Sequence, residues 1–320
     1  MRSVQYRAEA TSHIMGLIHM AEFFSDTFTQ PATWIGASKR YRGLMARARS
    51  QQILVHRVTA NSSERRPDDV IVEEPLEMRL DDVTINTTMR TPGHDFELAA
   101  GFCFTEGLLG RAHISEIRYC GTGSAVETEF NVVSISTNGN APTPTPRLGT
   151  ATSSCGICGT ASLDLLTQRL EPLATYGPWD LAPLLNAQAA VYAGQGLFEV
   201  TGAVHAAAMI SRVGMPSAIR EDVGRHNAVD KVIGRLLLDG KLPARDSALF
   251  VSGRASFEIV QKAWAAGFTA LVAVSAPTQL AVQTARAANM TLVAFVRGDG
   301  EATHANVYSP ADHQHPNPAG

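Results

Sequence analysis

The chain has 320 residues, of which 45% are hydrophobic and 18% are charged, and its formal net charge is −3 at pH 7. This composition is typical of a globular protein with one large or two smaller domains, and it excludes a wholly disordered chain. The slight acidity gives no general attraction to nucleic acid, and no apolar stretch reaches the roughly 20 residues of a membrane-spanning helix. Four cysteines are too few for a disulfide framework. We therefore expect a cytoplasmic protein that partners neither nucleic acid nor a membrane.

The composition changes along the chain and divides it into five parts. Residues 1–65 are expected to form a disordered leader. They are not expected to hold a secretory signal, because their apolar cluster Ile14–Met20 is interrupted by His19 and lies too far from a basic start. The basic run Lys39–Arg49 is either a phosphate or targeting patch or, as we favour, part of that leader. The rest divides into a small α+β domain (66–137), a proline-rich linker with a cysteine loop (138–159), a larger domain (160–309) and a disordered tail (310–320).

The small domain is expected to begin with a hairpin. Two β-rich runs, Val70–Leu80 and Val83–Arg90, flank the turn residues Asp81-Asp82. Thr91-Pro92-Gly93 then ends the second strand, and His94–Phe104 has the pattern of an amphipathic helix. Two further strands are expected, at Ile114–Tyr119 and Glu129–Ser136.

Beyond residue 160, apolar strands alternate with longer helices. Strands are expected at 248–251, 270–274 and 292–296, and helices at 256–266 and 279–288, the second capped by Thr278. This alternation predicts a mostly parallel sheet covered by helices, and such sheets bind ligands outside the carboxyl ends of their strands. The residues that follow these strands make a candidate pocket: Ser252-Gly253-Arg254, Ser275-Ala276-Pro277 and Arg297-Gly298-Asp299-Gly300.

The sharpest local motif is Cys155-Gly156-Ile157-Cys158, which stands between the proline-rich linker and an expected helix that starts at Thr160. A thiol at a helix N-terminus faces the positive end of the helix dipole, which lowers its pKa and raises its thiolate fraction. The small residues around the motif would let a cofactor or another protein approach the sulfur. We therefore favour a reactive sulfur site.

Other interpretations of the two cysteines are weaker. Structural zinc needs four ligands, whereas this motif supplies two, and Cys103 and Cys120 are widely separated in sequence. Two inert loop cysteines remain an alternative. A thioredoxin-type dithiol would follow an early strand of a βαβ unit, which is not its place here. A zinc deaminase is excluded because His205-Ala206-Ala207 has alanine where the catalytic glutamate belongs.

The polar block Arg220–Lys231 is a second candidate for ligand recognition. If a helix starts near Gly224, a spacing of four aligns Asp222, His226 and Asp230 on one side, with Asn227 and Lys231 in the neighbouring row. This density of hydrogen-bonding groups suits a polar ligand with phosphates. The alternative is a capped, solvated helix start, with His226 as a structural hydrogen-bonding group.

Taken together, these segments resemble the FdhD family, the sulfurtransferases required for formate dehydrogenase activity. The resemblance covers about residues 70–309. Its motifs are Glu74-Pro75-Leu76-Glu77, Thr91-Pro92-Gly93-His94-Asp95, Thr105-Glu106-Gly107, Ser154-Cys155-Gly156-Ile157-Cys158-Gly159, Thr201-Gly202, His205-Ala206-Ala207, Arg220–Lys231, Val251–Glu258, Val274–Thr278, Phe295–Gly298 and Asn306-Val307-Tyr308. The chain departs from the family pattern at Val200 and Ala203, and by extra residues at Asp299–Ala305.

The resemblance implies a fold and a sulfur relay. The fold is α/β, α+β overall, with a cytidine-deaminase-like three-layer C-terminal domain that lacks zinc and a smaller N-terminal α+β domain. A cysteine desulfurase would pass persulfide sulfur to Cys155, supported by Cys158. The sulfur would then reach the molybdenum bis(molybdopterin guanine dinucleotide) cofactor before its insertion into the formate dehydrogenase apoenzyme.

The resemblance also implies a homodimer that binds guanine nucleotide, with GDP as a mimic of the cofactor. Its binding stretch corresponds to Phe295, Val296, Arg297, Gly298, Asp299 and Gly300. The strand ends and the polar block add Ser252, Gly253, Arg254, Ser275 and His226 as candidates. Two other functions stay open: a non-catalytic chaperone for the molybdenum cofactor, and a dithiol redox protein.

Overall fold

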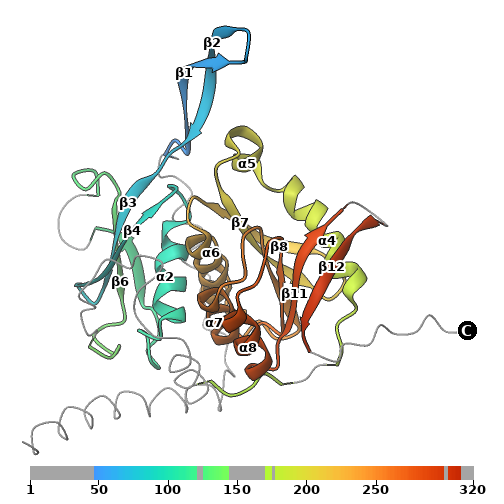
Figure 1. Cartoon of the computed structure of the whole chain (residues 1–320). Helices are drawn as coiled ribbons and strands as arrows, with labels where there is room; N and C mark the ends of the chain where they lie inside the picture. Colours follow the sequence, from blue (N-terminus) through green and yellow to red (C-terminus); the bar gives the residue numbers. More distant parts are fainter. Residues whose placement is uncertain (1–46, 121–124, 144–169, 175–176, 299–301, 311–320) are drawn as a thin grey trace, which may run out of the picture.

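The computed structural model describes residues 47–120, 125–143, 170–174, 177–298 and 302–310. These residues form a six-stranded sheet, a four-stranded sheet and a separate two-stranded hairpin, with helices packed between the two larger sheets (Figure 1). The architecture is mixed α/β, and α+β for the whole chain, as expected. Cys155, Cys158, Asp299, Gly300 and the helix expected from Thr160 lie outside the described residues.

The smaller sheet has four strands in the order β4-β3-β6-β5, with β3 and β6 parallel and the other pairs antiparallel. Its strands are β3 (Glu74–Leu80), β4 (Val83–Arg90), β5 (Glu116–Tyr119) and β6 (Val132–Ser136). Alternate residues of β3 are buried against helix α2 (Asp95–Thr105), which covers one face of the sheet. All five elements overlap the stretches expected from sequence, although β3 starts four residues after Val70, and β5 and β6 start two or three residues later than expected.

The turn between β3 and β4 explains why the sequence predicts this hairpin. Asp81 and Asp82 have φ values of 45° and 65°. Two successive residues with positive φ are typical of a type I′ turn, whose twist matches that of the flanking strands. Aspartate tolerates this region of backbone space better than most residues, so the predicted hairpin is confirmed.

The larger sheet has six strands in the order β12-β11-β10-β9-β7-β8. They are β7 (His205–Ser211), β8 (Pro216–Asp222), β9 (Ser247–Val251), β10 (Ala270–Ala273), β11 (Thr291–Arg297) and β12 (His304–Ser309). The three central strands β9, β10 and β11 are parallel, and β7, β8 and β12 are antiparallel to their neighbours. The expected parallel arrangement therefore holds for the centre of the sheet, while its edges are antiparallel.

Helices cover both faces of this sheet and make three layers. On one face lie α6 (Arg225–Leu238), α7 (Phe257–Ala265) and α8 (Gln279–Ala287). Helix α4 (Leu181–Ala193) covers the other face, and the short α5 (Gly196–Thr201) follows it. Thr278 caps α8 as expected, since its side chain accepts a hydrogen bond from the main-chain N of Ala281 at 3.2 Å.

A second hairpin lies in the segment expected to be a disordered leader. Strands β1 (Ser50–Val58) and β2 (Ser63–Ile71) pair in antiparallel fashion and project away from the body (Figure 1). The expectation of a disordered leader over residues 1–65 is therefore wrong for residues 50–65. Most residues of both strands are exposed, so neither face has the alternating apolar pattern by which strands are recognised. Main-chain pairing alone gives no such signal in a sequence.

Helices α2 and α6 join the two units at a contact made by two glycines. A Cβ atom on Gly101 would overlap the main-chain oxygen of Asp230, and one on Gly234 would overlap the main-chain oxygen of Glu97. The two backbones therefore touch directly, which only glycine permits. This contact places the small sheet and α2 against the helical layer of the large sheet.

Two buried ion pairs flank the glycine contact. Lys231 Nζ lies 2.6 Å from Asp222 Oδ2, and neither side chain is exposed to solvent. The same ammonium donates to the main-chain oxygen of Thr91 at 3.0 Å, which belongs to the small unit. Lys262 Nζ lies 2.9 Å from Asp230 Oδ2 and donates to the hydroxyl of Thr105, the last residue of α2, at 2.8 Å. Charges of the large unit thus bond to atoms of the small one.

Replacing Gly101 by alanine tests the helix contact. We expect Gly101→Ala to lower the free energy of unfolding by at least about 2 kcal/mol, because the added methyl group forces two packed backbones apart. Chemical denaturation monitored by circular dichroism measures this change. Gly196→Ala in α5 is the matched control, since nothing lies within 4 Å of its Cβ position. Equal stability of the two variants would contradict a tight contact between α2 and α6.

Candidate functional site

The carboxyl ends of the three parallel strands come together at one edge of the large sheet. Main-chain hydrogen bonds connect the loops that follow them: Ser275 N donates to Gly253 O at 3.2 Å, and Phe295 N donates to Ser275 O at 3.3 Å. The structure therefore brings together the predicted groups Ser252–Arg254, Ser275 and Phe295–Gly298. This edge is where ligands bind in open α/β sheets.

At the end of β11, not every predicted side chain is free to face a ligand. Val296 is fully buried in the core, so only its main chain can face a ligand. Arg297 is exposed, and its guanidinium folds back to donate to the main-chain oxygens of Val274 and Val296. Phe295 and Gly298 have φ values of 57° and 91°, which turn the chain sharply at this strand end.

The loop after β9 is held against β7 and α6. Ser252 Oγ accepts from the main-chain N of Ala206 at 2.9 Å. A Cβ atom on Gly253 would lie 3.4 Å from His205 Nδ1 and 3.8 Å from Arg225 Cδ. Arg254 is exposed beside this contact. The loop is thus fixed at its start, while a cationic side chain stands at the surface.

The polar block Arg220–Lys231 is divided between two roles. Asp222, Asp230 and Lys231 are buried and form the ion pairs that join the two units, so both earlier interpretations, ligand recognition and a solvated helix start, are wrong for these three residues. His226 does not join these ion pairs. Its Nε2 lies 4.0 Å from Glu258 Oε2 and is shielded from solvent, and it has no hydrogen-bond partner in the part of the chain that the structure describes. It is not a structural hydrogen-bonding hub.

The surroundings of the site favour neutral histidines. Burial, followed by the charges of Arg225 and Lys262, lowers the pKa of His226 to about 4, although Glu258 and Glu106 oppose this shift. Burial and Arg225 also lower the pKa of His205. Both histidines are therefore uncharged at neutral pH and can donate or accept a hydrogen bond without adding charge.

Sequence reasoning missed two side chains of this region. Arg225 is the first residue of α6 and Ser256 is the N-cap of α7. Each has a buried polar atom that finds no hydrogen-bond partner among the residues described. Both residues belong to motifs noted in the sequence, but the spacing of residues along the chain does not predict that α6 and α7 pack together. Their proximity follows from the packing of these two helices.

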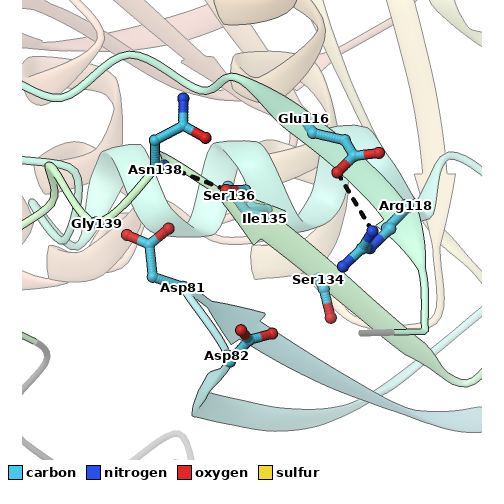
Figure 2. A pocket seen from close by; sticks show the side chains of 9 residues that line it. All are labelled: Asp81, Asp82, Glu116, Arg118, Ser134, Ile135, Ser136, Asn138 and Gly139. Carbon is cyan, nitrogen blue, oxygen red and sulfur yellow. Dashed lines mark hydrogen bonds and ion pairs between the residues drawn. The ribbon is translucent and has the colours of Figure 1, made fainter. Parts of the chain in front are cut away.

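A separate cavity of about 260 Å³ lies on the small unit (Figure 2). Its lining residues are Asp81, Asp82, Glu116, Arg118, Ser134, Ile135, Ser136, Asn138 and Gly139. Glu116 and Arg118 form an ion pair of 3.5 Å across its rim, while the Asp81 carboxylate accepts from the main-chain N of Thr137 at 2.7 Å. None of the predicted site residues lines this cavity.

Comparison with known proteins identifies the family that the sequence motifs resemble. A model of the FdhD/NarQ family matches residues 71–315. The chain belongs to the FdhD/NarQ family. A member of the family from Mycolicibacterium paratuberculosis, named sulfur carrier protein FdhD, is 44% identical over 265 residues, which cover 81% of this chain and 96% of that protein. A member of the same name from Streptomyces coelicolor is 45% identical over 267 residues, covering 81% and 93%.

A solved structure extends the comparison to the fold. A protein from Desulfotalea psychrophila, described as a formate dehydrogenase accessory protein, matches with a TM-score of 0.65 and 25% sequence identity. The match covers 82% of this chain and 97% of that one. Within the described residues, no helix combines the length and apolarity needed to cross a membrane.

The low pKa of His226 predicts a pH dependence of stability. The folded protein keeps this histidine neutral down to about pH 4, whereas an unfolded histidine binds a proton below about pH 6.5. Because the unfolded state then binds more protons, stability should fall as the pH drops from about 6.5 to 4, by up to about 2–3 kcal/mol for this group.

Urea denaturation at pH 7 and pH 4.5 measures this effect. The wild type should lose more stability than His226→Gln, which cannot take up that proton. His113→Gln is the control, because His113 is exposed, and its loss should match that of the wild type. Equal losses in the wild type and His226→Gln would show that His226 does not have a lowered pKa.

Proposed function

We propose that this protein is a sulfur carrier that accepts persulfide sulfur from a cysteine desulfurase and delivers it to a molybdenum cofactor. The observation that carries the proposal is membership in the FdhD/NarQ family together with the motif Cys155-Gly156-Ile157-Cys158. Curated relatives more than 40% identical over most of the chain are named sulfur carrier proteins.

The proposed loading step needs no external oxidant. The thiolate of Cys155 attacks the outer sulfur of the desulfurase persulfide, a new S–S bond forms on Cys155, and the desulfurase cysteine leaves as a thiolate. Cys158, which follows closely in sequence, would assist the next step, the transfer of sulfur from Cys155 to the recipient. Sulfur-transfer activity of this kind makes the protein a sulfurtransferase with a cysteine persulfide intermediate.

The proposed recipient is the molybdenum bis(molybdopterin guanine dinucleotide) cofactor, bound as a client at the carboxyl edge of the large sheet. Arg254 and Arg297 are exposed at this edge and can each contribute a charge-assisted hydrogen bond to a phosphate. The turn at Gly298 leaves main-chain groups for the same purpose. A guanine nucleotide such as GDP would occupy part of this site.

The proposed partners follow from the two ends of the relay. A cysteine desulfurase supplies the sulfur, and a formate dehydrogenase apoenzyme receives the finished cofactor, in keeping with the description of the Desulfotalea psychrophila structure. The relay would operate in the cytoplasm, with the protein as a homodimer. A non-catalytic cofactor chaperone is the alternative, and it would need the sheet edge but not the cysteine pair.

Maturation of formate dehydrogenase in cells separates these two functions. We expect Cys155→Ala to abolish dehydrogenase activity in a host that lacks its own copy of this gene, because the sulfur has no carrier. Thr152→Ala, just outside the cysteine motif, is the matched control and should support normal activity. Equal amounts of soluble protein must be present for both variants. Full dehydrogenase activity with Cys155→Ala would contradict sulfur transfer and favour the chaperone.

A further inference from the structure

Arg225 is a partly buried arginine that has no counterion among the described residues. It stands at the start of α6, packed against Gly253 of the loop that follows β9. Its Nε is shielded from solvent and has no hydrogen-bond partner, and no carboxylate of the described residues pairs with its guanidinium. Shielding a charged donor from water without a partner is costly. An arginine in this position is therefore suited to an anion from outside the chain.

Two neighbouring side chains also have a shielded polar atom that lacks a hydrogen-bond partner among the described residues. The Nε2 of His226, the next residue of α6, and the Oγ of Ser256, at the start of α7, are also shielded from solvent, and neither has a hydrogen-bond partner within the described ranges. His226 Nε2 lies 4.0 Å from Glu258 Oε2, so the first turns of the two helices face each other here. Three unpaired polar atoms on adjoining segments are unusual, because buried polar groups nearly always have partners.

The helix starts add to the electropositive character of this place. Neither α6 nor α7 has a side chain that caps its first turn, and unpaired N–H groups at helix starts attract anions. Ser256 occupies the N-cap position of α7, where a serine hydroxyl ordinarily bonds its own helix, but does not do so. The carboxylate of Glu258, 4.0 Å from His226 Nε2, is 45% exposed, so solvent weakens its repulsion of an anion.

We propose that Arg225, His226 and Ser256 form a subsite for a phosphate or diphosphate group, next to the three strand ends of the large sheet. The bound group accepts hydrogen bonds from the arginine, the serine hydroxyl and the imidazole. The identity of the natural ligand rests on the proposed function, in which the diphosphate belongs to a guanine nucleotide. The subsite extends that pocket from β11 across to α6 and α7.

Calorimetric titration of the full-length protein with inorganic pyrophosphate tests the subsite without any base. We expect Arg225→Gln to weaken binding at least tenfold, because it removes a charge-assisted contact. Arg225→Lys should recover only part of the loss, since lysine lacks the planar fork. Ser256→Ala should weaken binding about threefold or more, and this small change keeps the fold even if Arg225→Gln does not.

Arg245→Gln is the matched control for charge. Arg245 is exposed just before β9, at the opposite edge of the same sheet, so its loss should leave pyrophosphate affinity unchanged. Undetectable pyrophosphate binding to the wild type would overturn the proposal. It would also be overturned if Ser256→Ala and Arg225→Lys bound pyrophosphate as tightly as the wild type.

Titration with GDP separates this inference from the proposed function. If GDP binds no more tightly than pyrophosphate while Arg225→Gln loses both, the subsite is supported and the guanine-nucleotide part of the proposed function fails. If Arg297→Ala weakens GDP binding but Arg225→Gln and Ser256→Ala do not, the proposed pocket is supported and the subsite is wrong. If all three variants weaken GDP binding, both are supported.

Discussion

The direct backbone contact between α2 and α6 holds the molecule together as one body. Gly101 and Gly234 let the two helices approach until each lies against main-chain oxygens of the other. Among the described residues, the buried pairs Lys231–Asp222 and Lys262–Asp230 also lie between the two units, because Lys231 bonds to Thr91 and Lys262 bonds to Thr105. Attraction within a buried ion pair is largely offset by the cost of removing both charges from water. Separating the two units, however, would break the bonds of both ammonium groups to the small unit.

Helix α6 connects this contact to the functional edge of the molecule. Its first turn carries Arg225 and His226 beside the ends of the parallel strands, while its middle carries the buried charges and Gly234. A rigid helix that is fixed at its centre holds its first turn in place. Burial, and after it the positive field of Arg225 in that turn, lower the pKa of both His205 and His226. The same positive field suits the phosphates of a nucleotide, so one element links interdomain packing to the chemistry of the edge.

Elements with a local sequence signal were predicted, whereas strand β7 and helix α4 were not, although both have buried residues. The hairpin at Asp81-Asp82 and the cap at Thr278 have local signals, namely turn residues and a capping side chain. The hairpin β1–β2 has no covered face, so its strands show no periodicity. The roles of Asp222 and Lys231 depend on Thr91, which is 140 residues from Lys231 in sequence. Helical spacing places such residues on one side of a helix but does not identify what packs against them. Gly101 and Gly234 are a similar case. Glycine is unfavourable in a helix, and the sequence does not show which element packs against these two residues.

The proposed function assigns two tasks to separate parts of the chain: sulfur on Cys155, and the nucleotide end of the cofactor on the sheet edge. Mass spectrometry of the intact protein tests the first task most directly, after incubation with a cysteine desulfurase and cysteine. The account predicts a mass gain of one sulfur atom in the wild type, located on Cys155 by peptide mapping and removed by a reductant. Cys155→Ala should show no such gain, and Arg297→Ala should show it in full. A wild-type protein that acquires no sulfur, or acquires it equally after Cys155→Ala, would contradict the sulfur-carrier account.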